Sequence, residues 1–330
     1  MKRNYYILND GRIRRKDNTV YVENENKKGH IPINDIESIY VFGEIDFNSK
    51  ALNFLAQNNV TVHLFNYYGF YSSSFYPREY LLSGFSLVNQ VEKYTDKYER
   101  IKIAKEFIDS ASYNILKNLK YYNARRDDAL LDAIEFIEKE REKLPQISEI
   151  DELMGTEGRI RDKYYSTFNK ITKGQFKMGK RVKRPPNNPM NTLISFGNSL
   201  MYTTVLSEIY HTQLNPTVSY LHQPGERRFS LALDISEIFK PIIVDRIIFK
   251  LVNEKMIDEK HFTKELNFCH LNDKGKKIFL KQYDEKLNTT VKHKNLGRKV
   301  SYRRLVRLEC YKLLKHINDI QEYQGFKMWW

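Results

Sequence analysis

Residues 60–76 read VTVHLFNYYGFYSSSFY, and residues 101–119 read IKIAKEFIDSASYNILKNL. In the first stretch, β-branched and aromatic residues flank a turn at residues 66–69, which is typical of two short strands. In the second stretch, apolar residues recur at every third or fourth position, which predicts a long amphipathic helix. The pattern changes from strand to helix between the two stretches, near Gly84.

The strand pattern extends back to the start of the chain. We expect further strands there at residues 5–8, 20–22 and 36–42. We also expect a helix at residues 49–58, with Asn48 as its N-cap. After Gly84, further helices are expected at residues 129–143 and beyond Pro145. The sequence therefore predicts an α+β fold, with a small β-rich N-terminal domain (residues 1–85) followed by a larger, mostly α-helical domain (residues 86–330).

The composition restricts the class of partner. Lys and Arg total 55 against 41 Asp and Glu, so the formal net charge is +14, which favours a polyanion. The two cysteines exclude a disulfide framework and a cysteine-rich zinc module, and they fit a reducing cytoplasm. We expect no membrane-spanning helix, because the sequence has no apolar run of about 18 residues, and no secretory signal, because residues 1–10 lack an apolar segment. We therefore expect a cytoplasmic protein that binds nucleic acid rather than a membrane.

Two basic segments are candidate phosphate-binding sites. The first includes Lys180, Arg181, Lys183 and Arg184, and the second includes Arg303, Arg304 and Arg307. Lys299, Arg303 and Arg307 are expected to share one helix face. Either segment alone is equally well explained as solvated surface charge. Two such segments in a strongly basic chain favour contact with a nucleic-acid backbone, and neither contains a motif that reads sequence.

Residues 221–245, LHQPGERRFSLALDISEIFKPIIVD, carry the clearest chemistry. Asp234 and Glu237 are three residues apart, so on a helix they face the same way, and His222 precedes them. Two carboxylates beside one imidazole suit Mg²⁺ or Mn²⁺. The alternative is a solvated helix face and a structural histidine. The common nucleotide-binding loops and the serine-hydrolase GxSxG motif are absent from the sequence.

Glu157 is a separate candidate. It lies between Gly155 and Gly158, at the expected start of a helix. A carboxylate is favoured there by the helix dipole, so helix capping is the alternative to a metal-binding role. Spacing alone does not connect Glu157 to His222.

Several segments resemble the CRISPR-associated integrase family, the endonuclease-like proteins that insert new spacers during CRISPR adaptation. They are NYYILNDGRIRRKDNTVYVE at residues 4–23, LMGTEGRIRDKYYSTF at 153–168, RPPNNPMNTLISFGNSLMY at 184–202, LHQPGERRFSLALDISEIFKPIIVDR at 221–246 and FKMWW at 326–330. The N-terminal and C-terminal segments are similar to the branch that accompanies type I-B systems.

The resemblance implies a divalent metal held by Glu157, His222 and Glu237. Many members have Asp where this chain has Glu237, and Asp234 is either a further ligand or an orienting neighbour. It also implies that Arg161 and Tyr164, from the family's EG-x-x-R-x-x-YY pattern, belong to the site. The expected DNA contacts are Arg161, Tyr164, Lys180, Arg181, Lys183, Arg184, Arg303, Arg304 and Arg307.

The implied reaction is attack of a prespacer 3′-hydroxyl on a phosphodiester of the CRISPR repeat, in a helical catalytic domain. The implied assembly is a homodimer formed through the β-rich domain, whose aromatic turn carries Tyr67 and Tyr68. A small ferredoxin-like adaptation protein is expected to bridge two dimers. Two rival functions remain open: a non-catalytic nucleic-acid-binding module and a metal-dependent RNase.

Overall fold

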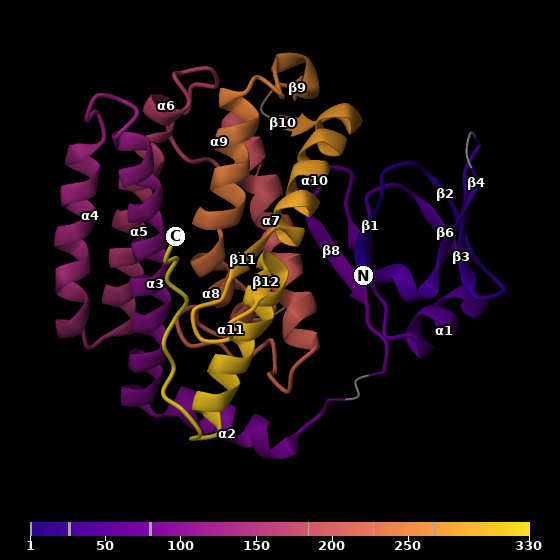
Figure 1. Ribbon diagram of the computed structural model, residues 1–330, viewed down its shortest axis with the longest axis horizontal. Helices are drawn as coiled ribbons and strands as arrows, with labels where there is room; N and C mark the ends of the chain where they lie inside the picture. The colour runs from indigo at the N-terminus through magenta and orange to yellow at the C-terminus, as the bar shows by residue number, and fades with distance from the viewer. Residues whose placement is uncertain (1, 26–27, 79–80, 184, 227, 267) are drawn as a thin grey trace.

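The computed structural model describes residues 2–25, 28–78, 81–183, 185–226, 228–266 and 268–330. The strand-rich N-terminal part lies to the right in Figure 1 and the helical part to the left. The first helix of the helical part, α2 (Gly84–Thr95), begins where the sequence pattern changes. The predicted α+β fold class is confirmed by this arrangement.

Two four-stranded sheets form the N-terminal part. Its strands are β1 (Arg3–Ile7), β2 (Gly11–Lys16), β3 (Thr19–Glu23), β4 (Lys28–Pro32), β5 (Ile36–Val41), β6 (Ile45–Phe47), β7 (Thr61–Phe65) and β8 (Tyr71–Phe75). One sheet has the order β1-β5-β7-β8, with its first three strands parallel, and the other has the order β4-β3-β2-β6. The helix α1 (Ser49–Gln57) begins after Asn48, whose side chain accepts a hydrogen bond from the Ala51 amide, as the sequence predicted.

Strand β5 contributes to two separate cores. Ile39 and Val41 pack with the apolar residues of the second sheet and α1. Tyr40, and Phe42 just after the end of the strand, alternate with these residues and face the helical part. The ring centroid of Phe42 lies 5.9 Å from that of Phe196 on α7. Because successive strand residues point to opposite faces, one strand serves both cores.

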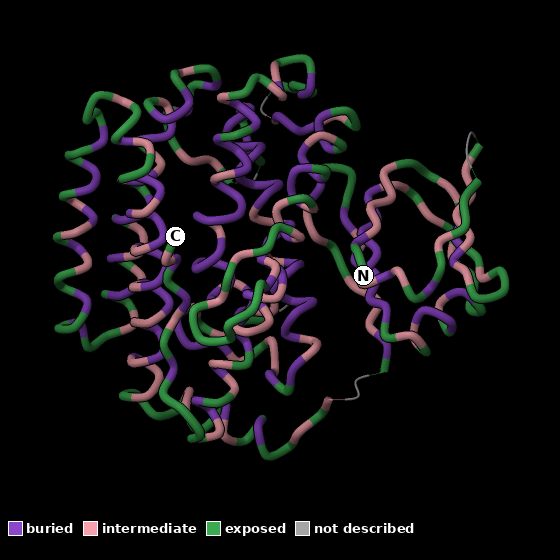
Figure 2. Tube along the Cα trace, in the orientation of Figure 1, coloured by how far each residue is buried: buried purple, intermediate pink, exposed green. Residues whose placement is uncertain are grey.

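The helical part is built around three buried helices. They are α3 (Lys97–Asn123), α7 (Pro189–Tyr210) and α8 (Ser230–Phe239), and Figure 2 shows long buried stretches along them. Helices α4 (Leu131–Lys143) and α5 (Ile150–Ser166) pack beside α3. A buried π-helical turn, η3 (Pro241–Asp245), joins α8 to α9 (Arg246–Asn253).

The remaining elements complete the helical part. They are α6 (Phe168–Ile171), β9 (Phe262–Glu265), β10 (Phe268–Leu271), α10 (Asp273–Asn288), β11 (Thr290–Lys292), β12 (Lys299–Ser301) and α11 (Tyr302–Ile317), with 3₁₀ turns η2 (Leu144–Gln146) and η4 (Glu259–His261). A further 3₁₀ turn, η1 (Ile33–Asp35), joins β4 to β5 in the N-terminal part. The C-terminal segment is held against α3 by Asn114, which bonds the backbone of both Phe326 and Met328. Within the described ranges, no helix is long and apolar enough to cross a membrane.

Candidate active site

Glu157 and Arg161 lie on one face of α5. They are four residues apart, and Arg161 Nε donates to Glu157 Oε1 over 3.1 Å. Helix α5 begins at Ile150, so Glu157 sits about two turns inside it. The expectation that Glu157 stands at a helix start was therefore wrong, and a capping role is excluded by its position. The glycines on either side of Glu157 are tolerated within the helix.

Asp234 and Glu237 share α8, as their spacing predicted. The Asp234 side chain has no exposed surface, and it accepts hydrogen bonds from the backbone amides of Tyr220, Leu221 and His222 at 2.8–3.0 Å. One carboxylate thus folds the loop before α8 into a fixed turn. Because backbone donors satisfy this carboxylate, Asp234 acts as an orienting group in this conformation.

His222 is held in a defined orientation by Asp234. Its Nδ1 atom lies 2.7 Å from Asp234 Oδ1. Burial opposes protonation of the ring, but the hydrogen bond and charge of Asp234 outweigh it and raise the pKa of His222. The contact at Nδ1 directs the opposite ring nitrogen, Nε2, away from Asp234. A carboxylate behind the imidazole is the usual support of a metal-binding histidine.

Glu237 lies between two cations. Arg161 and Lys240 both form ion pairs with its carboxylate. Burial alone would raise the pKa of Glu237, yet these two charges lower it to about 2. Arg161, only 8% exposed, bridges Glu157 and Glu237. Arg161 therefore connects the two carboxylates. Because it is buried and paired in this conformation, it is not accessible to DNA as the sequence predicted.

Glu157 and Glu237 line one small cavity together with Leu221, the neighbour of His222. Its volume of about 10 Å³ is near the lower limit for one water molecule. Among the residues that the structure describes, no three carboxylate, imidazole or thiol groups are already arranged as a metal cluster. The types of donor nevertheless fit Mg²⁺ or Mn²⁺, and Arg161 and Lys240 now balance the charge that a divalent cation would balance.

Tyr164 supports the site from behind. It has no exposed surface, and Asn118 Nδ2 donates both to its hydroxyl (3.1 Å) and to the carbonyl oxygen of Pro241 (2.7 Å). The second bond satisfies a carbonyl of the π-helical turn, where the regular helical pattern is interrupted. Tyr164 is therefore a packing residue, and the expectation that it contacts DNA directly is corrected by its burial.

The first basic segment is only partly free to bind DNA. Lys180 and Lys183 are exposed, whereas Arg184 lies outside the described residues. Arg181 is half-buried, and it donates to Asn191 Oδ1 (3.2 Å) and Ser195 Oγ (2.9 Å) on α7. Burial lowers the pKa of Arg181. Its guanidinium is thus oriented by the protein, while the two lysines project into solvent.

The second basic segment differs from its predicted helix face. Lys299 belongs to β12, because α11 begins only after Ser301, so Lys299 does not share that helix with Arg303 and Arg307. Arg307 forms ion pairs with Glu37 (2.9 Å) and Glu208. It therefore links the helical part to β5 and is structurally engaged, and it lines a groove together with Arg303 and Arg304.

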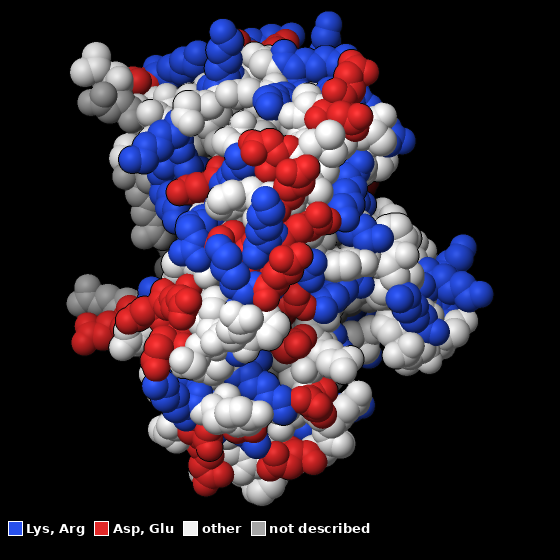
Figure 3. All heavy atoms as spheres, turned by 90° about the vertical axis from the view of Figure 1, so that its left-hand side faces the viewer, with Lys and Arg blue, Asp and Glu red and all other residues white. Residues whose placement is uncertain are grey.

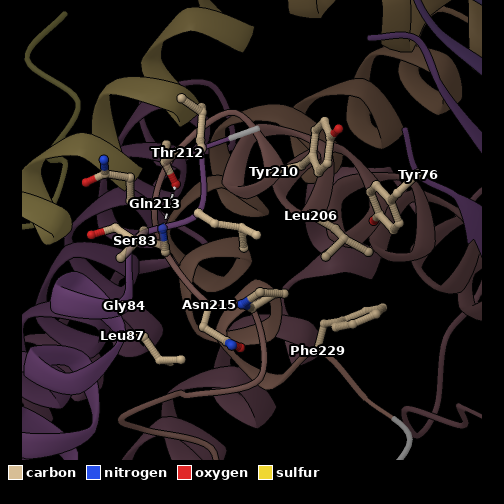
Figure 4. A pocket seen from close by; sticks show the side chains of 14 residues that line it. Tyr76, Ser83, Gly84, Leu87, Leu206, Tyr210, Thr212, Gln213, Asn215 and Phe229 are labelled. Carbon is tan, nitrogen blue, oxygen red and sulfur yellow. Dashed lines mark hydrogen bonds between the residues drawn. The ribbon is translucent and has the colours of Figure 1, made fainter. Parts of the chain in front are cut away.

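A separate apolar pocket of about 470 Å³ lies between the start of α2 and the end of α7. Tyr76, Leu206, Tyr210 and Phe229 contribute to its wall, as Figure 4 shows. Among the residues that the structure describes, no carboxylate or imidazole lines this pocket, so they do not supply the groups that the expected chemistry requires. The candidate active site remains the small cavity between α3, α5 and α8, where Glu157, Arg161 and Glu237 are the charged residues of a mostly apolar lining.

Three residues of this region were missed at the sequence level. Lys240 pairs with Glu237, Asn118 holds the π-helical turn, and Asp245 is buried beside Arg161. Burial raises the pKa of Asp245 to about 7. Lys240 was recognisable in principle, because it follows Glu237 by three positions. The other two depend on contacts between distant segments.

Comparison with known proteins identifies the family. Residues 5–285 match the model of the family described as "CRISPR associated protein Cas1". A CRISPR-associated endonuclease Cas1 of Thermodesulfovibrio yellowstonii is 53% identical and covers 99% of this chain and 100% of its own length. The chain belongs to the Cas1 family of CRISPR-associated proteins. This confirms the resemblance found in the sequence.

Solved structures agree with this assignment. The Cas1 protein TM1797 from Thermotoga maritima is 42% identical, with a TM-score of 0.87 over 98% of this chain and 99% of its own. A casposase bound to an integration product (21% identical, TM-score 0.85, 98% of this chain and 93% of its own) shares the fold. So does a chain of a Cas6-RT-Cas1–Cas2 complex (17% identical, TM-score 0.86, 100% of this chain and 36% of its own).

Proposed function

We propose that this chain is a metal-dependent DNA endonuclease and integrase, which inserts prespacer DNA into a CRISPR repeat array. The observation that carries the proposal is the joining of Glu157 and Glu237 through Arg161, beside a His222 that Asp234 orients. Helix α5 supplies Glu157 and Arg161, and the stretch from His222 to Glu237, far from α5 in the sequence, supplies the other groups. Membership of the Cas1 family and relatives named CRISPR-associated endonucleases support the same reaction class.

Glu157, His222 and Glu237 would hold one Mg²⁺ or Mn²⁺. When bound, the ion would lower the pKa of a hydroxyl nucleophile and stabilise charge on the phosphate. The carboxylates supply the oxygen ligands that such ions prefer, and Nε2 of His222 supplies the nitrogen. Asp234 fixes the imidazole in the orientation that makes Nε2 available.

The protein groups would align a prespacer 3′-hydroxyl with a phosphodiester of the repeat. Attack forms the new phosphodiester and releases the 3′-oxygen of the cleaved strand, whereas water at the same position would give hydrolysis. Lys180 and Lys183 are exposed and would bind DNA phosphates, with Arg181 oriented beside them. Arg184 completes this proposed segment but lies outside the described residues.

The proposed assembly is a homodimer formed through residues 1–85, with residues 86–330 as the catalytic domain. The casposase and the Cas1–Cas2 complex are the fold relatives whose names include an integration product and a protein partner. They support DNA and a small ferredoxin-like adaptation protein as partners of this chain. A cytoplasmic location agrees with both partners.

The decisive test is an integration assay with labelled prespacer and a supercoiled repeat plasmid. Glu157→Ala, His222→Ala and Glu237→Ala should each reduce strand transfer by at least about 10²-fold, or ≈ 2.7 kcal/mol of barrier. Duplex binding measured in parallel should change little. Near wild-type integration by Glu157→Ala would favour the non-catalytic binding module. Cleavage of RNA without integration of DNA would favour the RNase.

A further inference from the structure

A groove of about 520 Å³ lies between the β11–β12 hairpin, the first turns of α11 and the β-rich part. None of the candidate active-site residues lines it. We propose that this groove binds backbone phosphates of DNA as a second contact, separate from the active site. The inference rests on the proposed function, because it assumes that DNA is the partner.

The charge of the groove is one-sided. Among the residues that the structure describes, six cationic residues line it against one acidic residue, Glu37. Glu37 is already paired with Arg307 over 2.9 Å. Four of the cations, Lys2, Arg298, Lys299 and Arg304, form no ion pair with any described residue, whereas Arg303 lies 3.9 Å from Asp284. Such a surface attracts a polyanion.

Arg303 distinguishes the groove from an ordinary basic surface. It is only 9% exposed, and its Nε and Nη2 atoms make no hydrogen bond with any described residue. Asp284 Oδ1 is 3.9 Å from Nη2, beyond hydrogen-bonding distance. Leaving buried donors unpaired is costly, so this arrangement suits an anion that completes it. The guanidinium fork matches two oxygens of one phosphate.

The backbone of α11 adds to the attraction. The helix is 16 residues long and begins at the groove, with Ser301 as its N-cap. The positive end of its dipole therefore faces the same space as the side chains. Arg304, at the third position of the helix, extends the charge beyond Arg303. A buried guanidinium and a helix terminus thus converge on one location.

DNA fits the groove better than an acidic peptide. The exposed cations Arg298 and Lys299 continue the basic lining along the hairpin. A DNA strand presents one negative charge about every 3.4 Å, so it can meet several separated cations in succession. Arg307 is engaged by Glu37 and Glu208 and is expected to hold the groove wall rather than to contact phosphate.

The test measures duplex binding without divalent metal, so it is independent of strand transfer. The variant Arg298→Gln/Lys299→Gln/Arg304→Gln removes three accessible charges. Its affinity should fall at least about tenfold, and its plot of log K against log salt should be shallower by up to about three units. A second variant, Arg303→Lys, keeps the charge and removes the fork, and it should also weaken binding.

The control Lys97→Gln/Lys120→Gln/Lys139→Gln removes the same net charge from α3 and α4. Figure 3 shows that cations and acidic side chains are interspersed on this face, where Lys97 pairs with Glu149 and Lys120 with Glu138. Its salt slope should equal that of wild type. The proposal would be wrong if the wild type and all variants had the same salt slope. It would also be wrong if the two triple variants lost the same amount of duplex affinity.

Polyglutamate binding separates DNA from an acidic protein partner. If the groove variant loses polyglutamate binding but keeps the duplex slope, the DNA assignment is wrong. Thermal melting of each variant checks that the fold is retained. If the wild-type protein binds DNA through this groove but does not integrate prespacer DNA, the proposed function is wrong and the proposal for the groove still holds.

Discussion

The guanidinium of Arg161 on α5 pairs with the carboxylate of Glu237 on α8, and both side chains are almost fully buried. The same guanidinium also bonds Glu157, so it couples the two carboxylates of the candidate site. A charged pair that is removed from water is stable only while both partners are present. Arg161 therefore contributes to the fold as well as to the electrostatics of the site.

Arg161→Ala should destabilise the protein by about 3 kcal/mol, because it leaves Glu237 buried with Lys240 as its remaining cation. Urea unfolding at neutral pH measures the loss. Lys163→Ala on the same helix is the control, since Lys163 pairs with the exposed Asp132, and an ion pair at the surface contributes little to stability. Equal losses in the two variants would contradict the buried bridge.

Lys240→Met should increase the affinity for Mn²⁺ by roughly tenfold, about 1.4 kcal/mol, because Glu237 would lose one of two competing cations. Calorimetric titration of Mn²⁺ measures this directly. Lys250→Met is a suitable control, since Lys250 donates to Gln282 on α10 and not to the site. Unchanged affinity in Lys240→Met would argue against Glu237 as a ligand.

Asp234→Asn should release the turn that carries His222. An amide has one acceptor oxygen in place of two, so at least one of the bonds from Tyr220, Leu221 or His222 is lost, costing about 2 kcal/mol. Hydrogen exchange of these amides should accelerate, while Glu237→Gln should leave them protected. Strand transfer should fall less in Asp234→Asn than in Glu237→Gln. Equal inactivation of both would make Asp234 a direct ligand.

His63 should make the fold sensitive to acid. Burial lowers the pKa of His63 to about 3, from the ordinary histidine value of 6.5. The unfolded chain takes up a proton below pH 6.5 that the folded protein excludes until about pH 3. Stability is therefore complete above pH 6.5 and falls as the pH drops, by about 2 kcal/mol at pH 5.

His63→Asn removes this titration. Its loss of unfolding free energy between pH 7 and pH 5 should be about 2 kcal/mol smaller than that of wild type. The exposed His30 provides the control, because His30→Asn should retain the wild-type pH dependence. An identical pH dependence in His63→Asn and wild type would show that His63 is protonated in the folded protein.

Deletion of residues 1–85 should give a poorly soluble or monomeric fragment. Tyr40, Phe42 and Phe65 pack into the helical core, so their removal uncovers apolar surface. Tyr67 and Tyr68 remain exposed on the full chain and are available to a second copy. Light scattering measures the oligomeric state of the fragment and of the full-length protein. A full-length protein that is monomeric at micromolar concentration would contradict the dimer contact.

Local patterns predicted most of the secondary structure. The spacing of apolar residues predicted α3, and Asn48 marked the start of α1. The helix expected beyond Pro145 is α5, but Glu157 was placed at a helix start, whereas α5 begins at Ile150 and buried neighbours such as Leu153 and Ile160 keep it continuous through the two glycines. Lys299 was assigned to a helix because the capping signal of Ser301 was overlooked.

The site was less predictable than the fold. Helical spacing placed Asp234 and Glu237 on one helix, but local spacing gave no reason to bring Glu157 to the same cavity. That proximity depends on the packing of α5 and α8 against α3. The burial of Tyr164 and the ion pairs of Arg307 likewise depend on tertiary contacts. Both residues were predicted to contact DNA, but in the structure they stabilise the fold.

Strand β5 has a further consequence for how the chain comes apart. Its alternate residues are shared between the core of the two sheets and the core of the helices, and Ser38 on the same strand approaches Ser207 of α7 within 3.3 Å. Neither half can lose this strand without exposing the interior of the other. We therefore expect the two parts to unfold together in one cooperative transition on heating, even though their secondary structures differ.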